Sequence, residues 1–414
     1  MEWYHLISLA VVLPQLVFTF QVLNNYRYAL RESRKERSAY SPKTVMIVPC
    51  KGLDTNFRDN IRSFLLQDYD NFLLWFVVAD EADPAYAVLC ELKQQYAADS
   101  KAHDIRILIA GAAQGRGQKV HNMLHAYHQI DASIEVLAFA DADACVHEHW
   151  LSHIVYPLRK SHIGVTSGYR WFVPETNNLA SLALSAVNAK IVQLLGNTRF
   201  NLAWGGSMAI RVDVFRQLGL DEVWPRALSD DLVVSRGVRQ AGLKVTYVPA
   251  CLAASVDRMT WTQLGEFAQR QFVITRIGAP GTWWFGLCSS LYSVFGLWGL
   301  AAGALWGQGA GERQICYGIA SAVFFLNQMF RAILRQRMAG ALLARQRPQM
   351  TWAKVADVLF FWVWSILLLL FIVSSAFGRT ITWRGIKYEM VSLTETTMLA
   401  SESDDRGEQS ASGR

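Results

Sequence analysis

The chain carries long apolar stretches at both ends and, between them, short apolar runs separated by polar and charged residues. Four stretches predict helices in a lipid bilayer, since ~20 apolar residues at 1.5 Å each cross about 30 Å of hydrocarbon. They are Trp3–Leu23, Trp283–Trp306, Ile315–Phe330 and Val355–Phe377. The third is the weakest, because Asn327 and Gln328 interrupt it.

A basic cluster follows the first stretch, at Arg27, Arg31, Arg34, Lys35 and Arg37. A cleaved signal peptide needs basic residues before its apolar core and small residues after it, which is the reverse order. A membrane anchor is therefore favoured over a signal peptide or a buried helix. The positive-inside rule places the basic end in the cytosol and the N-terminus outside.

Basic residues near the C-terminal stretches give conflicting predictions for the side of the membrane on which the C-terminus lies. Six of them predict a cytosolic loop between the last two stretches, namely Arg331, Arg335, Arg337, Arg345, Arg347 and Lys354. Four full crossings would then leave the C-terminus outside, whereas Arg379, Arg384 and Lys387 favour the inside. One re-entrant or interfacial stretch would remove the conflict.

The central region has the alternating pattern of an α/β domain. Strands are predicted at Thr44–Val48, Phe72–Ala79, Ile105–Ile109, Glu135–Ala140 and Ile163–Ser167. Helices are predicted at Arg58–Gln67, Pro84–Tyr96, Lys119–Ile130 and Asn178–Leu195. This order indicates a mostly parallel, doubly wound sheet, in which ligands bind beyond the carboxyl ends of the strands.

These patterns divide the chain into seven segments. They are a transmembrane helix (1–26), a basic linker (27–41), the α/β domain (42–257), an amphipathic interfacial helix (258–280), a transmembrane region of two or three spans (281–378), a tail motif (379–393) and a tail (394–414). The last segment is rich in Ser, Thr, Glu and Gly without apolar periodicity, so we expect it to be disordered.

Composition narrows the class of protein. With 52% hydrophobic residues, 15 Trp and 18% charged residues, the chain is neither disordered nor collagen-like nor a disulfide-rich secreted module. The six cysteines form no C-x-x-C pair, so no zinc or iron–sulfur site is expected and the thiols are taken as reduced. No nucleic-acid partner is expected, and the oligomeric state is left open.

Carboxylates follow two of the predicted strands. Asp80 comes after the second strand, where a lone Asp can equally cap a helix or form a turn. Asp141 and Asp143 follow the fourth strand, and alternate residues of an extended segment project the same way. Two converging carboxylates are suitable ligands for Mg²⁺ or Mn²⁺.

The Gly-rich stretch at 111–119 has neither a P-loop ending nor a dinucleotide fingerprint, which excludes an ATPase or dehydrogenase on motif grounds. Arg116 and Lys119, at a helix start, are placed to meet an anionic ligand. A solvated basic turn explains the spacing equally well.

Two further groups stand downstream. Gly205 and Gly206 permit close approach to the backbone, as a substrate floor requires, although a tight turn also explains them. Asp230 and Asp231 are adjacent carboxylates that raise each other's pKa, so that one can act as a general base. Their alternative role is to cap the following helix.

A helix is predicted just before the first C-terminal stretch. Trp261, Leu264, Ala268 and Phe272 share one face of it, and basic residues surround them at Arg258, Arg270 and Arg276. Such a helix can lie in the membrane interface, with its basic side chains facing headgroups or a diphosphate.

The order of these motifs resembles that of the membrane-bound glycosyltransferases of family 2. The motifs are Asp80, Lys119, Asp141-Ala142-Asp143, the Gly205-Gly206 segment and Asp230-Asp231, followed by an Arg-bearing helix. The resemblance is greatest to the ceramide glucosyltransferase branch, including its bacterial lipid glycosyltransferases. Residues 383–388 are similar to a tail motif of that group.

The resemblance implies a GT-A fold, a UDP-sugar donor, a membrane lipid acceptor and Mg²⁺ or Mn²⁺ as cofactor. It implies that Asp141 and Asp143 hold the metal ion, that Asp231, beside Asp230, is the catalytic base, and that Asp80 faces uracil. The remaining nucleotide-sugar contacts that it implies are Pro49, Lys119, Asp141, Gly205, Gly206 and Arg270. The enzyme would be a multi-pass integral membrane protein with a cytosolic catalytic domain, in a bacterial inner membrane.

The chain departs from the family pattern at the Q/R-x-x-R-W signature. This signature falls on residues 267–271, where only Arg270 matches and Gln271 replaces the Trp. The departure disfavours a processive polysaccharide synthase, which remains one alternative. The other alternative is a membrane protein whose α/β domain binds a nucleotide without catalysis.

Overall fold

The structure is a computed structural model of the whole chain and describes residues 2–37, 40–113, 117–306, 311–383 and 386–401. Arg116 and Arg384, two of the basic residues singled out above, lie outside the described residues.

A seven-stranded sheet forms the centre of the α/β domain, with strand order β3-β2-β1-β4-β6-β5-β7. The strands are β1 (Thr44–Pro49), β2 (Phe72–Val78), β3 (Asp104–Ile109), β4 (Val136–Ala140), β5 (Ile163–Pro174), β6 (Ser207–Arg211) and β7 (Lys244–Asp257). The first four strands run parallel, β5 and β7 pair parallel, and β6 is antiparallel to both of its neighbours. The predicted mostly parallel α/β fold is confirmed.

Two strands of this sheet, β6 and β7, were not predicted, and β5 continues beyond Ser167 to Pro174. The apolar pattern that predicted this strand is interrupted at Arg170, a charged residue between Tyr169 and Trp171. In the structure this segment pairs with β7, where Trp171 lies opposite Ala254, so tertiary pairing extends the strand past the polar position.

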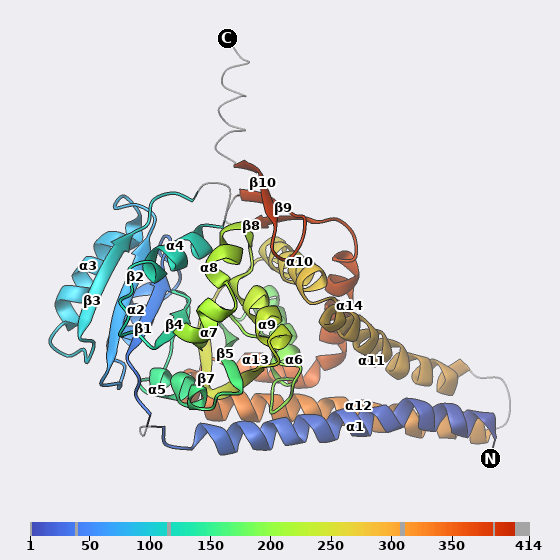
Figure 1. Cartoon of the computed structure of the whole chain (residues 1–414). Helices are drawn as coiled ribbons and strands as arrows, with labels where there is room; N and C mark the ends of the chain where they lie inside the picture. Colours follow the sequence, from blue (N-terminus) through green and yellow to red (C-terminus); the bar gives the residue numbers. More distant parts are fainter. Residues whose placement is uncertain (1, 38–39, 114–116, 307–310, 384–385, 402–414) are drawn as a thin grey trace, which may run out of the picture.

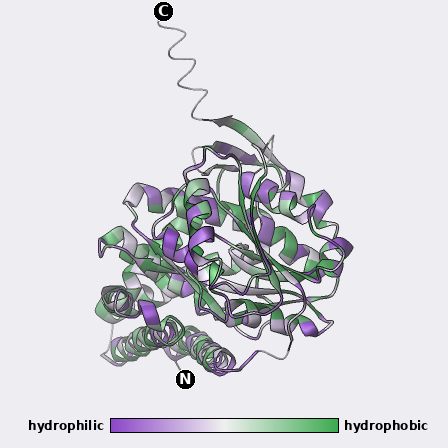
Figure 2. Cartoon of the chain, turned by 90° about the vertical axis from the view of Figure 1, so that its left-hand side faces the viewer, coloured by the Kyte–Doolittle hydropathy of each residue, from purple (hydrophilic) through white to green (hydrophobic). Residues whose placement is uncertain are grey.

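Helices cover both faces of the sheet. Those of the domain are α2 (Phe57–Leu65), α3 (Pro84–Tyr96), α4 (Gln118–Tyr127), α5 (Trp150–Val155), α6 (Leu179–Val192), α7 (Val212–Gln217), α8 (Leu220–Val223) and α9 (Asp230–Gln240). Side chains of β1 alternate between two cores, one shared with α2, α3 and α5 and the other with α4, α7, α8 and α9. The surrounding helices therefore mix hydrophobic and hydrophilic residues along their length (Figure 2).

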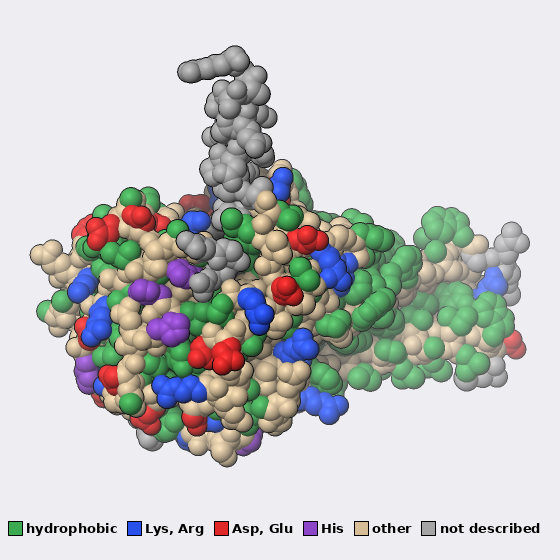
Figure 3. All heavy atoms as spheres, turned by 45° about the horizontal axis from the view of Figure 1, so that its top comes forward, with side chains coloured by type: hydrophobic (Ala, Val, Ile, Leu, Met, Phe, Trp, Pro, Cys, Tyr) green, Lys and Arg blue, Asp and Glu red, His purple; other side chains and the backbone are tan. Residues whose placement is uncertain are grey.

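Within the described residues, three long helices outside the domain are apolar enough to cross a membrane: α1 (Trp3–Ser33), α11 (Pro280–Trp306) and α12 (Gly311–Leu342). They expose large apolar side chains, among them Val17, Phe295 and Ile315 at 68%, 65% and 63%. Figure 1 shows α1 and α12 side by side, and Figure 3 shows hydrophobic side chains over the projecting helices. Exposed apolar surface of this extent indicates membrane association.

The fourth predicted span, Val355–Phe377, is not one straight helix. It is divided into α13 (Thr351–Leu359) and α14 (Phe361–Ser374), which meet at 85°. The stretch expected to be weakest, Ile315–Phe330, instead lies within the continuous helix α12. Trp364 Nε1 donates to the Ala356 carbonyl across the bend, and the Phe360 N–H donates to the same oxygen, so these hydrogen bonds link the two helices at the break.

The predicted loop between the last two stretches begins later than expected, because α12 continues to Leu342 and leaves Arg345 and Arg347 between α12 and α13. Its cytosolic side stays a prediction. Arg331 and Arg335 lie inside α12 and are buried, at 9% and 3% exposure. Arg335 makes two hydrogen bonds with Asp357 of α13, at 2.7 and 2.5 Å, so the side chains that suggested a loop form a buried polar contact between helices.

Helix α10 (Trp261–Gly278) and a second sheet complete the fold. Thr260 and Gln263 form a capping box that starts α10. The second sheet contains β8 (Thr380–Trp383), β9 (Ile386–Met390) and β10 (Thr396–Ser401). Strand β10 lies in the tail that we expected to be disordered, and its antiparallel pairing with β9 supplies order that composition did not indicate.

Candidate functional site

A cavity of about 630 Å³ connects the α/β domain to the apolar helices. Its polar end lies beyond β1 and β4 and includes Asp141, Asp143, Asp230, Asp231 and Lys119. Residues of α1, α11, α12 and α14 line its other end. Carboxylates far apart in the sequence are thus gathered at the carboxyl edge of the parallel strands, as the fold predicts.

Asp141 and Asp143 share one partner, Arg170 on β5. Arg170 Nη2 lies 2.9 Å from Asp141 Oδ2 and 3.0 Å from Asp143 Oδ1, and Nη1 lies 2.9 Å from Asp143 Oδ2. The guanidinium packs between Trp204 and Phe172, at 4.9 and 5.3 Å from their ring centres. The two carboxylates do converge on one point, and that point is held by a cation of the protein itself.

Lys119 is the second cation of the cluster. Its Nζ lies 2.8 Å from Asp141 Oδ1 and 3.2 Å from Asp230 Oδ2. Burial lowers the pKa of Lys119, but the Asp141 and Asp230 carboxylates raise it above its usual value. Lys119 therefore remains charged, and it links Asp141 of the predicted metal-binding pair to Asp230.

Asp230 and Asp231 occupy different environments at the start of α9. Asp230 is 4% exposed, and burial raises its pKa to about 6, with the charges of Asp231 and Asp141 acting in the same direction and Lys119 opposing them. Asp231 is partly exposed to the cavity; its Oδ1 accepts from the Ser229 hydroxyl and the Leu232 N–H, and its Oδ2 accepts from the Gly205 N–H. Ser229 caps α9, and both carboxylates line the cavity. The role of Asp231 as general base stays a prediction.

Gly205 and Gly206 pack closely against carboxylate side chains of the site. Neither glycine lines the cavity, so they do not form the expected substrate floor. A Cβ at Gly205 would overlap the Asp230 carboxylate, and a Cβ at Gly206 would overlap the Asp141 carboxylate and the Trp204 ring. Their role is to let the backbone approach these side chains closely.

Asp80 and Pro49 differ in their positions. Pro49 ends β1 and lines the cavity. Asp80 follows β2 on the same edge of the sheet but is exposed and does not line the cavity; its Oδ1 accepts from the Ala82 N–H, as in a turn. The contact between Asp80 and uracil stays a prediction.

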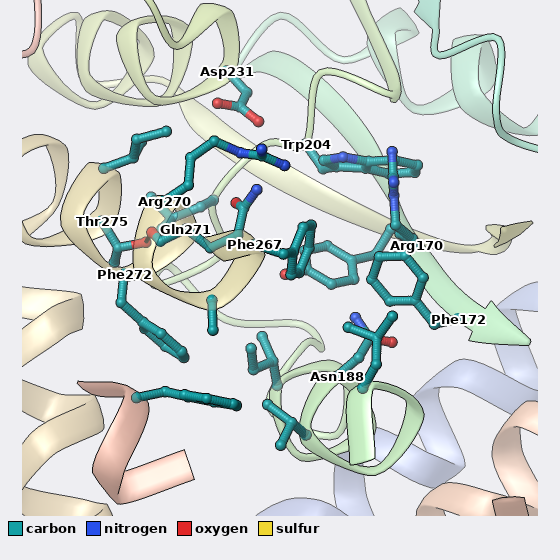
Figure 4. A pocket seen from close by; sticks show the side chains of 18 of the residues that line it. Arg170, Phe172, Asn188, Trp204, Asp231, Phe267, Arg270, Gln271, Phe272 and Thr275 are labelled. Atoms are coloured by element: carbon teal, nitrogen blue, oxygen red, sulfur yellow. Dashed lines mark hydrogen bonds between the residues drawn. The ribbon is translucent and has the colours of Figure 1, made fainter. Parts of the chain in front are cut away.

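Helix α10 forms one wall of the cavity (Figure 4). Arg270 and Gln271 both line it, and the Arg270 guanidinium lies 5.4 Å from the ring centre of Phe267. Arg276, expected to face headgroups or a diphosphate, donates instead to the backbone carbonyls of Ala376 and Gly378.

Several residues that line the cavity were not predicted as site residues from the sequence, among them Arg170, Trp204 and Lys190. Arg170 had a signal, because it interrupts an aromatic run that is otherwise typical of a buried strand. Lys190 lies on the apolar helix α6, and a lysine within such a helix was the available sign of a polar cavity.

The carboxylates suit a divalent ion of the Mg²⁺ or Mn²⁺ type. Such ions are commonly bound by one or two carboxylates together with substrate phosphates, and Asp141 and Asp143 can supply those two. Among the described residues no group of three or more His, Cys, Asp or Glu side chains is arranged for a metal ion. Arg170 would have to leave at least one carboxylate for an ion to be held there.

The fold and the cavity define an α/β protein associated with membranes through long apolar helices, with a charged site at their junction. The chain belongs to glycosyl transferase family 21, whose sequence model matches residues 4–395. It is therefore a glycosyltransferase, as the order of motifs led us to expect, and the family that matches is 21.

Two solved structures are similar over much of the chain. The mannosyltransferase PcManGT from Pyrobaculum calidifontis, in complex with GDP-Man and Mn²⁺, is 15% identical, with a TM-score of 0.44 over 90% of this chain and 97% of that chain. A mycobacterial protein is 11% identical, with a TM-score of 0.36 over 58% of this chain and 75% of that chain. Likeness at this level does not identify a substrate.

Proposed function

We propose that this glycosyltransferase moves a single sugar from a UDP-sugar to the hydroxyl of a membrane lipid, with inversion at the anomeric carbon. The observation that carries the proposal is one continuous cavity, which has the carboxylate pairs at one end and residues of the apolar helices at the other. A water-soluble donor and a lipid acceptor meet only at such a junction. The domain has the GT-A type of arrangement in this proposal.

The donor occupies the end of the cavity near Lys119 and Asp141. Asp141 and Asp143 would hold a divalent ion, which when bound would supply positive charge to the diphosphate leaving group. Lys119 and Arg270, both cavity residues, stabilise the same negative charge as it develops. Pro49 and Asp80 complete the nucleotide contacts in this proposal.

Asp231 is the proposed base. The acceptor oxygen forms a bond to the anomeric carbon as the bond from that carbon to the UDP oxygen breaks, and the hydroxyl proton passes to Asp231. Asp231 suits this role better than Asp230, because it is partly exposed to the cavity and has three hydrogen-bond donors that fix its orientation. Asp230, buried against Lys119, positions that lysine.

The bent pair α13–α14 also supports a cytosolic site. If α1, α11 and α12 cross the membrane and the bent pair re-enters on one side, three crossings place the C-terminus with the α/β domain. This agrees with the basic residues Arg379 and Lys387 and removes the conflict found in the sequence.

The proposal is tested with purified full-length protein in lipid nanodiscs, incubated with labelled UDP-sugars, GDP-mannose and a membrane lipid extract. A single labelled glycolipid from a UDP-sugar is expected, detected by mass spectrometry. A ladder of products would identify a processive synthase, and labelling from GDP-mannose alone would contradict the UDP donor.

The roles of the residues are tested separately. Asp231→Asn should abolish transfer and leave UDP binding close to that of the wild type, measured by calorimetry. Asp70→Asn is the matched control, because the Asp70 side chain is 83% exposed outside the cavity. Chelation of divalent ions should stop transfer; near-normal turnover in chelator removes the metal role.

A further inference from the structure

The membrane-side end of the cavity contains a cluster of buried and half-buried polar residues, contributed by α1, α6, α12, α13 and α14. Lys190, Arg331 and Arg335 are its cations, and all three line the cavity. Asp357 is its carboxylate.

The charges in this cluster do not balance. Asp357 is fully buried and accepts two hydrogen bonds from Arg335 and one from Gln336 Nε2 at 2.8 Å, so it neutralises Arg335. Arg331 donates instead to a neutral oxygen, Gln15 Oε1 at 2.7 Å, and no carboxylate among the described residues lies within ion-pair distance of it. Burying a charge without a partner is costly, so this arrangement calls for an anion.

Lys190 is half-buried and also has a neutral hydrogen-bond partner. Its Nζ donates to Ser365 Oγ at 2.8 Å, and in the described part of the chain it has no carboxylate partner within ion-pair distance. Burial holds the pKa of Lys190 well below its usual value, and the charges of Arg335 and Arg331 lower it further. A negative group between these side chains would restore the charged form.

The cluster lies at the depth of the apolar helices. Gln15, the partner of Arg331, is roughly 18 Å along α1 from Trp3, and α1 is long and apolar enough to cross a membrane. Phe18 lines the cavity beside it, with its ring centre 5.8 Å from the Arg331 guanidinium carbon. A ligand here has apolar helices around it and cations in the cavity, which is the environment of a lipid headgroup.

We infer that the membrane-side end of this cavity binds the anionic headgroup of a membrane lipid, a phosphate diester, through Lys190 and Arg331. Arg335 borders this site but stays paired with Asp357. This is a binding site that goes beyond the proposed transfer reaction, and lipid retention needs no turnover.

The test uses the full chain reconstituted in phosphatidylcholine nanodiscs with a minority of phosphatidylglycerol, then extracted and examined by native mass spectrometry. The wild type should retain phosphatidylglycerol over phosphatidylcholine by about tenfold, equal to about 1.4 kcal/mol. A double variant with Lys190→Gln and Arg331→Gln should lose the preference. Arg337→Gln is the control, since Arg337 is exposed on the same helix.

The charge-conserving double variant, Lys190→Arg with Arg331→Lys, should keep the preference, which separates loss of charge from loss of folding. Equal retention of both lipids by the wild type, or an unchanged preference in the Gln double variant, overturns the inference. Displacement of phosphatidylglycerol by millimolar inorganic phosphate also overturns it, because the site would then be one for small anions.

Discussion

The Arg170 guanidinium lies across the Asp143 carboxylate, with Nη1 2.9 Å from Oδ2 and Nη2 3.0 Å from Oδ1. Because Nη2 also contacts Asp141, one arginine satisfies both carboxylates proposed to hold a divalent ion. The ion and the guanidinium therefore compete for the same oxygens.

Replacing Arg170 should strengthen metal binding in the absence of nucleotide. Arg170→Gln removes the competing charge, so the Kd for Mn²⁺ should fall by about tenfold, measured by calorimetry on the full chain. Arg159→Gln is the control, because Arg159 is exposed and lies over Tyr156, away from the cavity. An unchanged Mn²⁺ affinity in the Arg170 variant would show that the two cations do not compete.

Gly206→Ala should lower transfer by about a hundredfold or more, since its Cβ would displace the Asp141 carboxylate and the Trp204 ring from their positions. The measurement is kcat with saturating donor, alongside thermal unfolding. Gly265→Ala, on α10, is the matched control, because no heavy atom lies within 4 Å of its added Cβ. That control should gain stability slightly, by about 0.5–1 kcal/mol. Normal turnover in Gly206→Ala would contradict the packing argument.

Asp230 should make stability fall as pH rises. Its folded pKa, about 6, is above the ordinary value of 3.8, so between these values the folded state binds more protons than the unfolded state. The free energy of unfolding therefore decreases from pH 4 to pH 6, by on the order of 2 kcal/mol from this group. Asp230→Asn should remove that part of the slope when thermal unfolding of the two proteins is compared. Parallel slopes for the variant and the wild type would refute the assignment.

The bent pair α13–α14 leads to a topology prediction. In a background with all six cysteines replaced by Ser, Arg345→Cys and Glu389→Cys should react with an impermeant maleimide from the same side of a sealed vesicle, since both positions are exposed. Glu2→Cys should react from the opposite side. Labelling of positions 345 and 389 from opposite sides would mean that the bent pair crosses the membrane.

The periodicity of apolar residues predicted the elements that depend on local sequence alone. The helix Pro84–Tyr96 was predicted with the bounds that the structure gives, because its apolar spacing and its Asp83 cap are local properties. Strands β6 and β7 were missed because their burial comes from distant partners. The 85° bend between α13 and α14 was likewise hidden, since hydropathy sums residues without regard to direction.

The sequence by itself determined that this chain has an α/β domain between apolar helices and that its carboxylates follow strand ends, because strand and helix periods and hydropathy are written along the chain. The tertiary structure alone decided that Arg170 lies between Asp141 and Asp143, and that Lys190 and Arg331 share a cavity. Those relationships depend on which elements pack together, and packing joins residues that no local pattern connects.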